Sequence, residues 1–185
     1  MSVSSIAKKG FTLVELLIVI AILAVLAAAV VIVLNPAELL AQSRDSQRLS
    51  DMDTLKNAVA VYISQATTPA LGTCTGGGCC MVGTAGPFTN AVCVTRTGTA
   101  TDGAATNWID INFNGLPGGS PIPYLPKDPS NTATYFYSYA NTASPTLTFE
   151  IDCALESSKY AGKEATDGGN AASWYEVGTD AGLDL

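Results

Sequence analysis

A chain of 185 residues has room for one ordinary domain with an attached segment, but not for two domains. Its formal charge is −7, from 9 basic and 16 acidic side chains, and only four of the basic residues lie from Ala70 onward. Nucleic-acid binding needs clustered Lys and Arg to replace counterions, so this composition predicts no nucleic-acid partner.

The N-terminal third begins with a polar segment that ends in Lys8-Lys9-Gly10, and an almost wholly apolar block follows. The 19 residues from Leu16 to Leu34 contain no charge and no proline. At about 1.5 Å per residue, a helix of that length spans a bilayer. Because basic residues beside a span stay in the cytosol, Lys8 and Lys9 place the first residues inside and the rest of the chain outside.

One carboxylate, that of Glu15, interrupts the apolar block. A charge inside a membrane costs about 2.5–3.5 kcal/mol on insertion scales, and a plain membrane anchor has no use for it. Glu15 is therefore predicted to have a partner of opposite charge.

Two simpler interpretations account for part of this segment. A secretory signal also has a basic start and an apolar core, and Ala27-Ala28-Ala29 is compatible with its cleavage site. A single-pass anchor is the second alternative. Both leave Glu15 unexplained, and the apolar run continues beyond the three alanines to Leu34, so neither is favoured.

The segment KKGFTLVE, residues 8–15, resembles the processing site of class III prepilins, the precursors of type IV pilins and of type II secretion pseudopilins. Their pattern is a basic leader that ends in Gly, then Phe, with Glu as the fifth mature residue. The resemblance covers roughly residues 8–65. It implies that a prepilin peptidase cuts between Gly10 and Phe11 and methylates the new N-terminus at Phe11. The amine of Phe11 would then be the partner of Glu15 on a neighbouring subunit.

For the fold, the resemblance implies an α+β chain in which a long N-terminal helix packs on a small antiparallel β-sheet head. The first half of that helix is transmembrane and the second half is amphipathic. The expected divisions are a cleaved leader over 1–10, the transmembrane and polymerisation helix over 11–35, the amphipathic stem over 36–66 and the exported head over 67–185.

The stem is predicted to begin at Asn35-Pro36, a typical start of a helix. Apolar residues then recur at three- and four-residue intervals, at Leu49, Met52, Leu55, Val59 and Tyr62. The charged residues are predicted to lie largely off that stripe, as solvated pairs or subunit contacts: Arg44, Asp45, Arg48, Asp51 and Lys56. Whether Pro36 kinks a continuous helix or marks a locally unwound point stays open.

The head is predicted to contain three to five antiparallel strands packed on the stem. A linker rich in Gly, Thr and Cys, with no regular element, precedes them over 67–86. The strand candidates are 91–95, 108–113, 135–139, 146–153 and 174–177. The proline-rich segment 121–129 must be extended and outside the central strands. Its LPKDP sequence resembles the segment before the β-region of major pseudopilins, although the Trp-Gly that commonly follows there is replaced by Ser130-Asn131.

Five cysteines lie in the head, at Cys74, Cys79, Cys80, Cys93 and Cys153. Their spacing fits no zinc site, and the chain has no histidine. In an exported domain they predict one or two disulfides with one thiol left over. Adjacent cysteines do not easily bond to each other, so Cys79 and Cys80 are each expected to have a different partner, and the connectivity stays open.

The C-terminal stretch is rich in glycine and oxygen ligands. Major pseudopilins bind calcium in a C-terminal loop, and by resemblance the implied ligands here are Asp167, Asn170 and Asp180. A plain polar turn is the alternative, because no D-x-D-x-D-G ladder is present. No other cofactor is expected.

The resemblance implies a structural function, as a subunit that polymerises into a type IV pilus-like filament. A minor pilin or adhesin whose head binds a surface or ligand, or a pseudopilin of a type II secretion system, is the alternative. The implied partners are further copies of the chain, the prepilin peptidase and the membrane assembly machinery. The precursor is expected in the cytoplasmic membrane with its head outside, and the product in an extracellular or periplasmic filament. No enzyme is expected, because histidine, a phosphate-binding Gly-rich loop and a G-x-S-x-G elbow are all missing.

The mature protein is predicted to begin at Phe11, because a basic leader that ends in Gly10 is the recognition pattern of the peptidase. Intact mass spectrometry of protein from the native membrane measures this directly, and an added methyl group reports the modification. A product that begins at Val30 would instead indicate a secretory signal.

Overall fold

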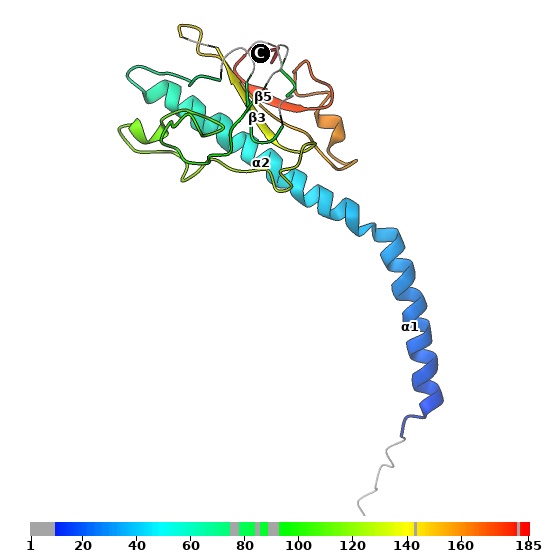
Figure 1. Cartoon of the computed structure of the whole chain (residues 1–185). Coiled ribbons are helices and arrows are strands. Elements are labelled where there is room, and N and C mark those ends of the chain that lie inside the picture. The colour runs from blue at the N-terminus through cyan, green and yellow to red at the C-terminus, as the bar shows by residue number, and fades with distance from the viewer. Residues whose placement is uncertain (1–9, 75–77, 84–85, 89–92, 143, 181) are drawn as a thin grey trace, which may run out of the picture. The chain divides into compact units, whose positions relative to one another are not determined.

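The computed structural model of the chain describes residues 10–74, 78–83, 86–88, 93–142, 144–180 and 182–185. Residues 1–9, and with them Lys8 and Lys9, lie outside the described part. The chain divides into two compact units, Met1–Leu39 and Leu40–Leu185. Figure 1 shows the helices and strands of each unit.

The first unit contains helix α1, Leu13–Leu34. Its 22 residues are long and apolar enough to cross a membrane by length and composition. None of these residues, all of which the structure describes, is buried within the chain. The apolar surface of α1 therefore has no cover from its own chain.

Helix α1 ends at Asn35, whose φ of 41° is left-handed and incompatible with a continuing helix. Helix α2, Pro36–Gln65, begins at the next residue, and the backbone amides of Glu38 and Leu39 donate to the carbonyl of Asn35. Proline suits this first position because its missing N–H would have no partner there. The predicted start of a second helix at Asn35-Pro36 is confirmed, and a single left-handed residue separates the two helices.

One face of α2 is buried, at three- and four-residue intervals as predicted. The buried residues are Ala41, Asp45, Arg48, Met52, Leu55, Ala58, Val59 and Tyr62. The prediction was wrong for Asp45 and Arg48, which lie on the buried face and are both fully inaccessible. Leu49, predicted on the stripe, is only half-buried.

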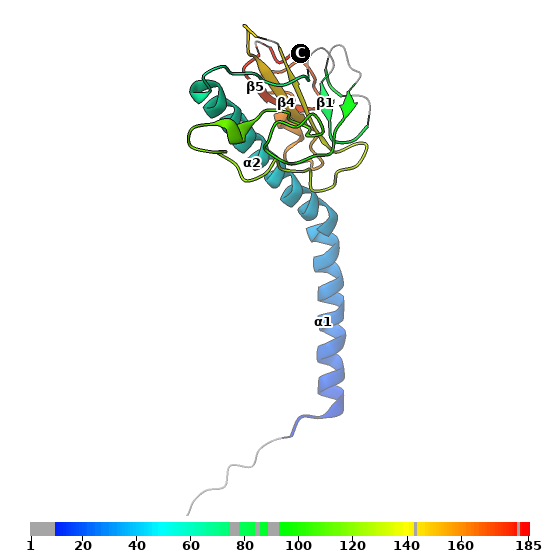
Figure 2. The same cartoon turned by 60° about the vertical axis from the view of Figure 1, so that its left-hand side comes forward.

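The described residues of the second unit form a five-stranded sheet in the order β2-β1-β3-β4-β5. The strands are β1 Cys79–Cys80, β2 Val94–Thr95, β3 Tyr137–Asn141, β4 Phe149–Cys153 and β5 Tyr175–Gly178. Short 3-10 turns occur at Phe113–Gly115 and Ala161–Lys163. The neighbouring pairs β1–β3, β3–β4 and β4–β5 are antiparallel, whereas β1 and β2 are parallel, so the sheet is mixed rather than wholly antiparallel. Figure 2 shows β4 between β1 and β5.

Three predicted strands coincide with β3, β4 and β5 to within a few residues. β2 occupies the end of the predicted strand 91–95, whose first two residues lie outside the described part. β1 lies inside the segment predicted to be an irregular linker, so that prediction was wrong. A two-residue strand among glycines and cysteines has no periodic pattern from which to predict it.

The predicted strand over 108–113 is also wrong. Trp108, Ile109, Ile111 and Phe113 are all fully buried, so the segment has no exposed face of the kind that alternation predicts. Instead of a strand it forms isolated β-bridges: Trp108 donates to the carbonyl of Gly98 beside the parallel bridge between Gly98 and Asn107, and Asn112 pairs with Asp102 in an antiparallel bridge. The segment is an irregular apolar loop that fills the core.

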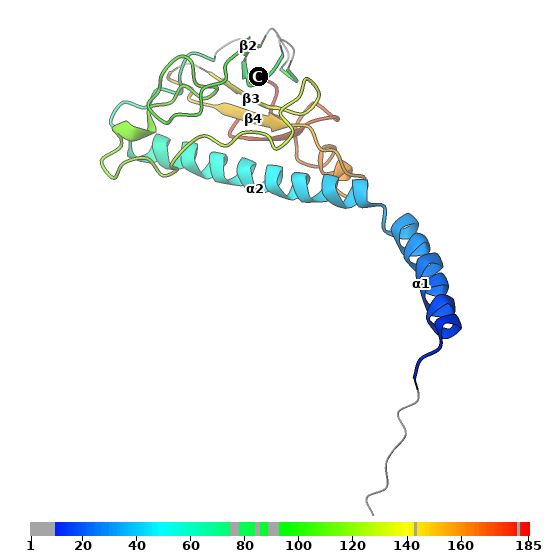
Figure 3. The ribbon, with the colours of Figure 1, turned by 60° about the horizontal axis from the view of Figure 1, so that its bottom comes forward.

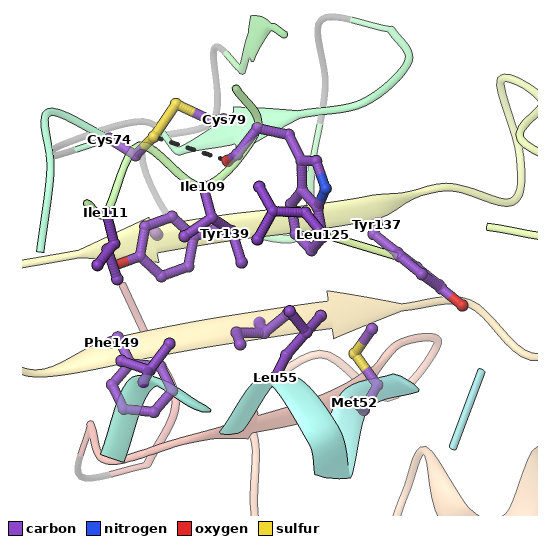
Figure 4. Close-up of a cluster of buried hydrophobic side chains, with 14 of the residues drawn as sticks. Met52, Leu55, Cys74, Cys79, Ile109, Ile111, Leu125, Tyr137, Tyr139 and Phe149 are labelled. Carbon is purple, nitrogen blue, oxygen red and sulfur yellow. Dashed lines mark hydrogen bonds between the residues drawn. A yellow bond between two sulfur atoms is a disulfide. The ribbon is translucent and has the colours of Figure 1, made fainter. Parts of the chain in front are cut away.

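The hydrophobic core lies between the sheet and α2, which runs along the sheet beneath β3 and β4 (Figure 3). Figure 4 shows Met52 and Leu55 of α2 in one cluster with Tyr139 of β3 and Phe149 of β4. Ile109 belongs to the same cluster. One continuous core therefore joins the stem, the sheet and the irregular loop.

A buried guanidinium fixes α2 to the loops beside the sheet. The Nε and Nη2 atoms of Arg48 donate to the two carboxylate oxygens of Asp128, at 2.6 and 3.0 Å. Nη1 donates to Asp45 at 2.8 Å, and Nη2 also donates to Glu156 at 2.5 Å. All of these groups except Glu156 have no accessible side-chain surface, and that of Glu156 is 10% exposed.

The carboxylates around Arg48 have further donors. Asp45 accepts hydrogen bonds from the backbone amides of Glu156 and Ser157 and from the Ser157 hydroxyl. Asp128 accepts from the backbone amides of Ser130 and Asn131. Asp45 and Arg48, both predicted to be solvated, are stable in the interior because Arg48 is paired with carboxylates and those carboxylates accept further hydrogen bonds.

The pKa values in this cluster reflect the mutual pairing. Burial lowers the pKa of Arg48, but the hydrogen bonds to Asp128 and Glu156 outweigh burial and raise it. Burial likewise raises the pKa of Glu156, but hydrogen bonds from Arg44 and Arg48 outweigh it and lower the pKa to about 2. Arg48 and Glu156 are therefore both charged throughout the neutral range.

The Asp128→Ala substitution is expected to destabilise the protein by about 3–5 kcal/mol, because it leaves the guanidinium of Arg48 buried without its bidentate partner. Denaturant unfolding of the mature chain in detergent, followed by near-UV circular dichroism, measures the change. Lys127→Ala is the matched control, because its exposed side chain lies one residue away and its loss is expected to cost less than about 0.5 kcal/mol. A cost below about 1 kcal/mol for Asp128→Ala would contradict the assigned role.

Two disulfides cross-link the described part of the head, Cys74–Cys79 and Cys80–Cys93. The adjacent cysteines of β1 thus have different partners. Cys153 on β4 is a free, buried cysteine. Burial raises the pKa of its thiol well above the ordinary value, which keeps the thiol protonated and unreactive.

Mass mapping without reduction is expected to recover the pairs Cys74–Cys79 and Cys80–Cys93, with Cys153 as the free thiol. Because Cys153 is buried, an alkylating reagent is expected to label it only after denaturation. Five thiols in protein recovered from the native membrane, or Cys153 in a disulfide, would contradict this assignment.

Candidate functional site

The residues before α1 form an exposed, non-helical segment. Gly10 has no neighbouring atom within 4 Å of the position of a Cβ, and Phe11 is 75% exposed. Regular helix begins only at Leu13. The bond between Gly10 and Phe11, the predicted cleavage point, therefore lies in an accessible stretch of chain directly before the first helical turn.

Thr12 and Glu15 form a capping box at the start of α1. The hydroxyl of Thr12 accepts a hydrogen bond from the backbone amide of Glu15 at 3.2 Å. In return, the backbone amide and hydroxyl of Thr12 donate to Oε2 of Glu15, at 2.8 and 2.7 Å. Two of the amides that a helix leaves unpaired at its start are satisfied in this way.

The capping box changes the interpretation of Glu15. The sequence predicted a partner of opposite charge for Glu15, and within its own chain the structure gives it neutral donors, the amide and hydroxyl of Thr12. The Thr-x-x-Glu spacing in the sequence is the signal from which this capping box could have been predicted. Both hydrogen bonds end on Oε2, so Oε1 of this exposed side chain has no donor among the described residues. One carboxylate oxygen thus stays available for a group on another molecule.

The predicted calcium ligands do not share one environment. Asp167 accepts hydrogen bonds from the backbone amides of Gly169 and Glu176, and Asp180 accepts from that of Asp184. Asp167 and Asp180 both line a cavity of about 320 Å³. Asn170 is exposed and is not among the residues that line it. A calcium site formed by all three stays a prediction.

A second acidic group, which the sequence analysis did not single out as a site, lies beside that cavity. Within the described part of the chain, Glu150, Asp152 and Glu176 are the one group of at least three Cys, Asp or Glu side chains whose oxygens could hold a metal ion together. All three are buried. The register of the sheet places Asp152 opposite Glu176, and the alternation along β4 places Glu150 on the same face.

Burial controls the ionisation of these three carboxyl groups. It raises the pKa of Glu176 to about 8 and that of Asp152 well above its ordinary value. Burial also raises the pKa of Glu150. The neighbouring carboxylates add to the effect, because each disfavours a second negative charge beside it.

Comparison with known proteins identifies the N-terminal segment. Residues 6–31 match the family model of the prokaryotic N-terminal methylation motif, the class III prepilin motif of type IV pilins and pseudopilins. No curated protein and no solved structure gave a significant match to the chain. The matched segment contains Gly10, Phe11 and Glu15, and extends over most of α1. It is typical of a structural, pilin-like protein, made as a membrane-anchored precursor and processed by a prepilin peptidase.

Proposed function

We propose that the chain is a structural subunit of a type IV pilus-like filament, which polymerises through α1 after cleavage before Phe11 and N-methylation of that residue. The observation that carries the proposal is the prepilin motif at the start of a helix with no buried residue in its own chain.

The exposed surface of α1 supports polymerisation through this helix. Apart from Glu15 in the first turn, its side chains are apolar all round, with large exposed residues from Leu13 to Leu34. Such a surface needs a bilayer before assembly, and in a filament the corresponding helices of other subunits would cover it. The head does not need α1 for its core, because every residue of the core cluster belongs to the second unit.

Apolar packing alone does not set the axial position of a subunit, and a charge pair would do so. Cleavage releases the amine of Phe11, and methylation to a secondary amine retains its positive charge. Glu15 has one carboxylate oxygen without a donor among the described residues, and the pairing of that oxygen with the amine of an adjoining subunit would set the axial position of each new subunit. In the low-dielectric interior of a helix bundle, such a pair is strongly attractive.

The alternative functions differ in what the head contacts. The LPKDP segment, which resembles that of major pseudopilins, contains Asp128, the buried partner of Arg48. This structural role accounts for the aspartate without a secretion system, so the segment does not favour a pseudopilin over a pilin. An adhesin-like minor subunit would require a binding surface on the head. The filament proposal requires none, because it rests on α1 alone.

Glu15→Gln and Glu15→Ala are both expected to reduce the incorporation of subunits into filaments by at least about tenfold, with leader cleavage intact. A glutamine keeps the capping box, which accepts either residue, but removes the charge. An alanine removes both. Sheared filaments and processed protein that stays in the membrane are quantified by immunoblotting for each variant.

Thr12→Ala is the matched control, because it removes the hydroxyl of the capping box and keeps the charge of Glu15. Its filaments are expected to form nearly as in the wild type, since a lost cap costs only about 0.5–2 kcal/mol. Normal filaments from Glu15→Gln would show that the charge is not the assembly contact. Normal filaments from Glu15→Ala as well would remove Glu15 from the mechanism altogether.

A further inference from the structure

Three carboxylates meet on the outer face of the sheet. Glu150 and Asp152 alternate along β4 with Phe149, Ile151 and Cys153, which belong to the hydrophobic core on the other face. Glu176 lies opposite Asp152 on β5. One carboxylate oxygen from each of the three residues lies within 4.8 Å of the others, and none of the three residues is more than 1% exposed.

The hydrogen bonds to this cluster leave two buried oxygens unused. Ser138 donates to Oδ2 of Asp152 at 3.1 Å, and the backbone amide of Ala171 donates to Oε2 of Glu176 at 3.0 Å. The remaining oxygens, Oδ1 of Asp152 and Oε1 of Glu176, have no hydrogen-bond partner among the described residues. One carboxylate oxygen of Glu150 lies within 4.8 Å of an oxygen of Asp152 and of one of Glu176. Two ionised carboxylates in contact repel unless a cation or a proton lies between them.

The described part of the chain supplies no positive side chain to this cluster. The ion pairs in that part join Arg44 and Arg48 to the acidic groups beside α2, and Arg96 to Asp110. Lys56 lines the adjacent cavity, but it forms no ion pair with Glu150, Asp152 or Glu176 in the described residues. Ionised carboxylates buried together are strongly destabilising unless a cation or protons offset their charge, and no side chain in the described residues does so through an ion pair.

We propose that Glu150, Asp152 and Glu176 form a binding site for a divalent cation of the calcium type. Carboxylate oxygens are the ligands that calcium prefers, at 2.3–2.6 Å, so two oxygens on one ion are at most about 5 Å apart. The spacing of the three oxygens meets that limit. Calcium takes 6–8 ligands, and the cavity of about 320 Å³ that Glu176 lines offers water a route to complete the shell.

This site is distinct from the loop site that the resemblance implied. Its ligands lie on strands β4 and β5; Glu176 lines the cavity together with Asp167 and Asp180, whereas Glu150 and Asp152 are not among the residues that line it. The site also holds the end of the chain, because the backbone amide of Leu185 donates to Glu150. A bound cation would therefore join two strands, the 167–171 loop and the C-terminus. The proposal does not depend on filament formation.

Calcium binding to the mature chain in detergent, after removal of metal with a chelator, tests the site. Isothermal titration with calcium chloride at pH 7.5 is expected to show one site per chain. Saturating calcium is expected to raise the melting temperature of the near-UV signal by several degrees, as linkage requires for a ligand that binds only the folded state. Asp152→Asn and Glu176→Gln, which keep the side-chain shapes, are each expected to weaken calcium binding at least about tenfold.

Asp53→Asn is the matched control, because its exposed carboxylate lines the same cavity and is not part of the cluster. It is expected to bind calcium as the wild type does, and so is Asp180→Asn. Loss of binding in Asp180→Asn with retention in Asp152→Asn and Glu176→Gln would place the ion in the loop and overturn the proposal. A wild-type chain that shows no heat of calcium binding and no rise in melting temperature would also overturn it, and would leave protons as the compensating charge.

Discussion

The architecture of the head depends on one buried guanidinium. Arg48 projects from α2 and binds Asp128, which belongs to the proline-rich segment, and Glu156, which follows β4. Neither segment has regular secondary structure around these residues to hold it in place. Proline removes backbone donors from the first segment, so side-chain contacts must replace the hydrogen bonds of a strand. The planar, multiple-donor geometry of arginine lets one residue serve both segments, which lysine could not do.

The stem helix α2 and the head form one structural unit. The core joins α2 to the sheet by apolar contact, and the Arg48 cluster joins it to the loops by charge. Everything from Leu40 onward therefore shares one interior, whereas α1 contributes nothing to it. The acidic exterior suits water, and the uncharged surface of α1 beyond Glu15 suits lipid or other helices.

The sequence predicted those features that depend on local pattern. The N-terminal motif, the apolar span, the start of α2 and strands β3 to β5 all leave a signature in consecutive residues. The positions of Asp45 and Arg48 could not be predicted in this way, because charged residues are buried only when a partner far along the chain is available, here Asp128 and Glu156. The apolar loop over 108–113 was predicted as a strand because a short apolar segment has the same composition whether it is a strand or an irregular segment buried on all sides.

The candidate sites also differ in whether a local sequence pattern could predict them. Gly10, Phe11 and Glu15 were predicted as site residues from their spacing, and all three lie inside the segment that the family model matches. The capping box could have been identified from Thr12 and Glu15 and was overlooked. The cluster of Glu150, Asp152 and Glu176 needed the pairing of β4 with β5, which no local pattern reveals. Alternation along β4 indicated that Glu150 and Asp152 share a face, but not that a third carboxylate lies opposite.

The uniform surface of α1 also bears on mechanics. An ordinary amphipathic helix has one direction in which to face its neighbours, whereas a helix that is apolar all round makes equivalent contacts at every angle about its own axis. Along the axis of α1, only the polar groups of the first turn differ from the apolar side chains that follow. In the proposed filament, the charge pair at the first turn would fix each helix along its axis, whereas the apolar surface would leave rotation about that axis much less restricted. Such a bundle would resist stretching and yet change its helical twist under tension while the same apolar area stays covered.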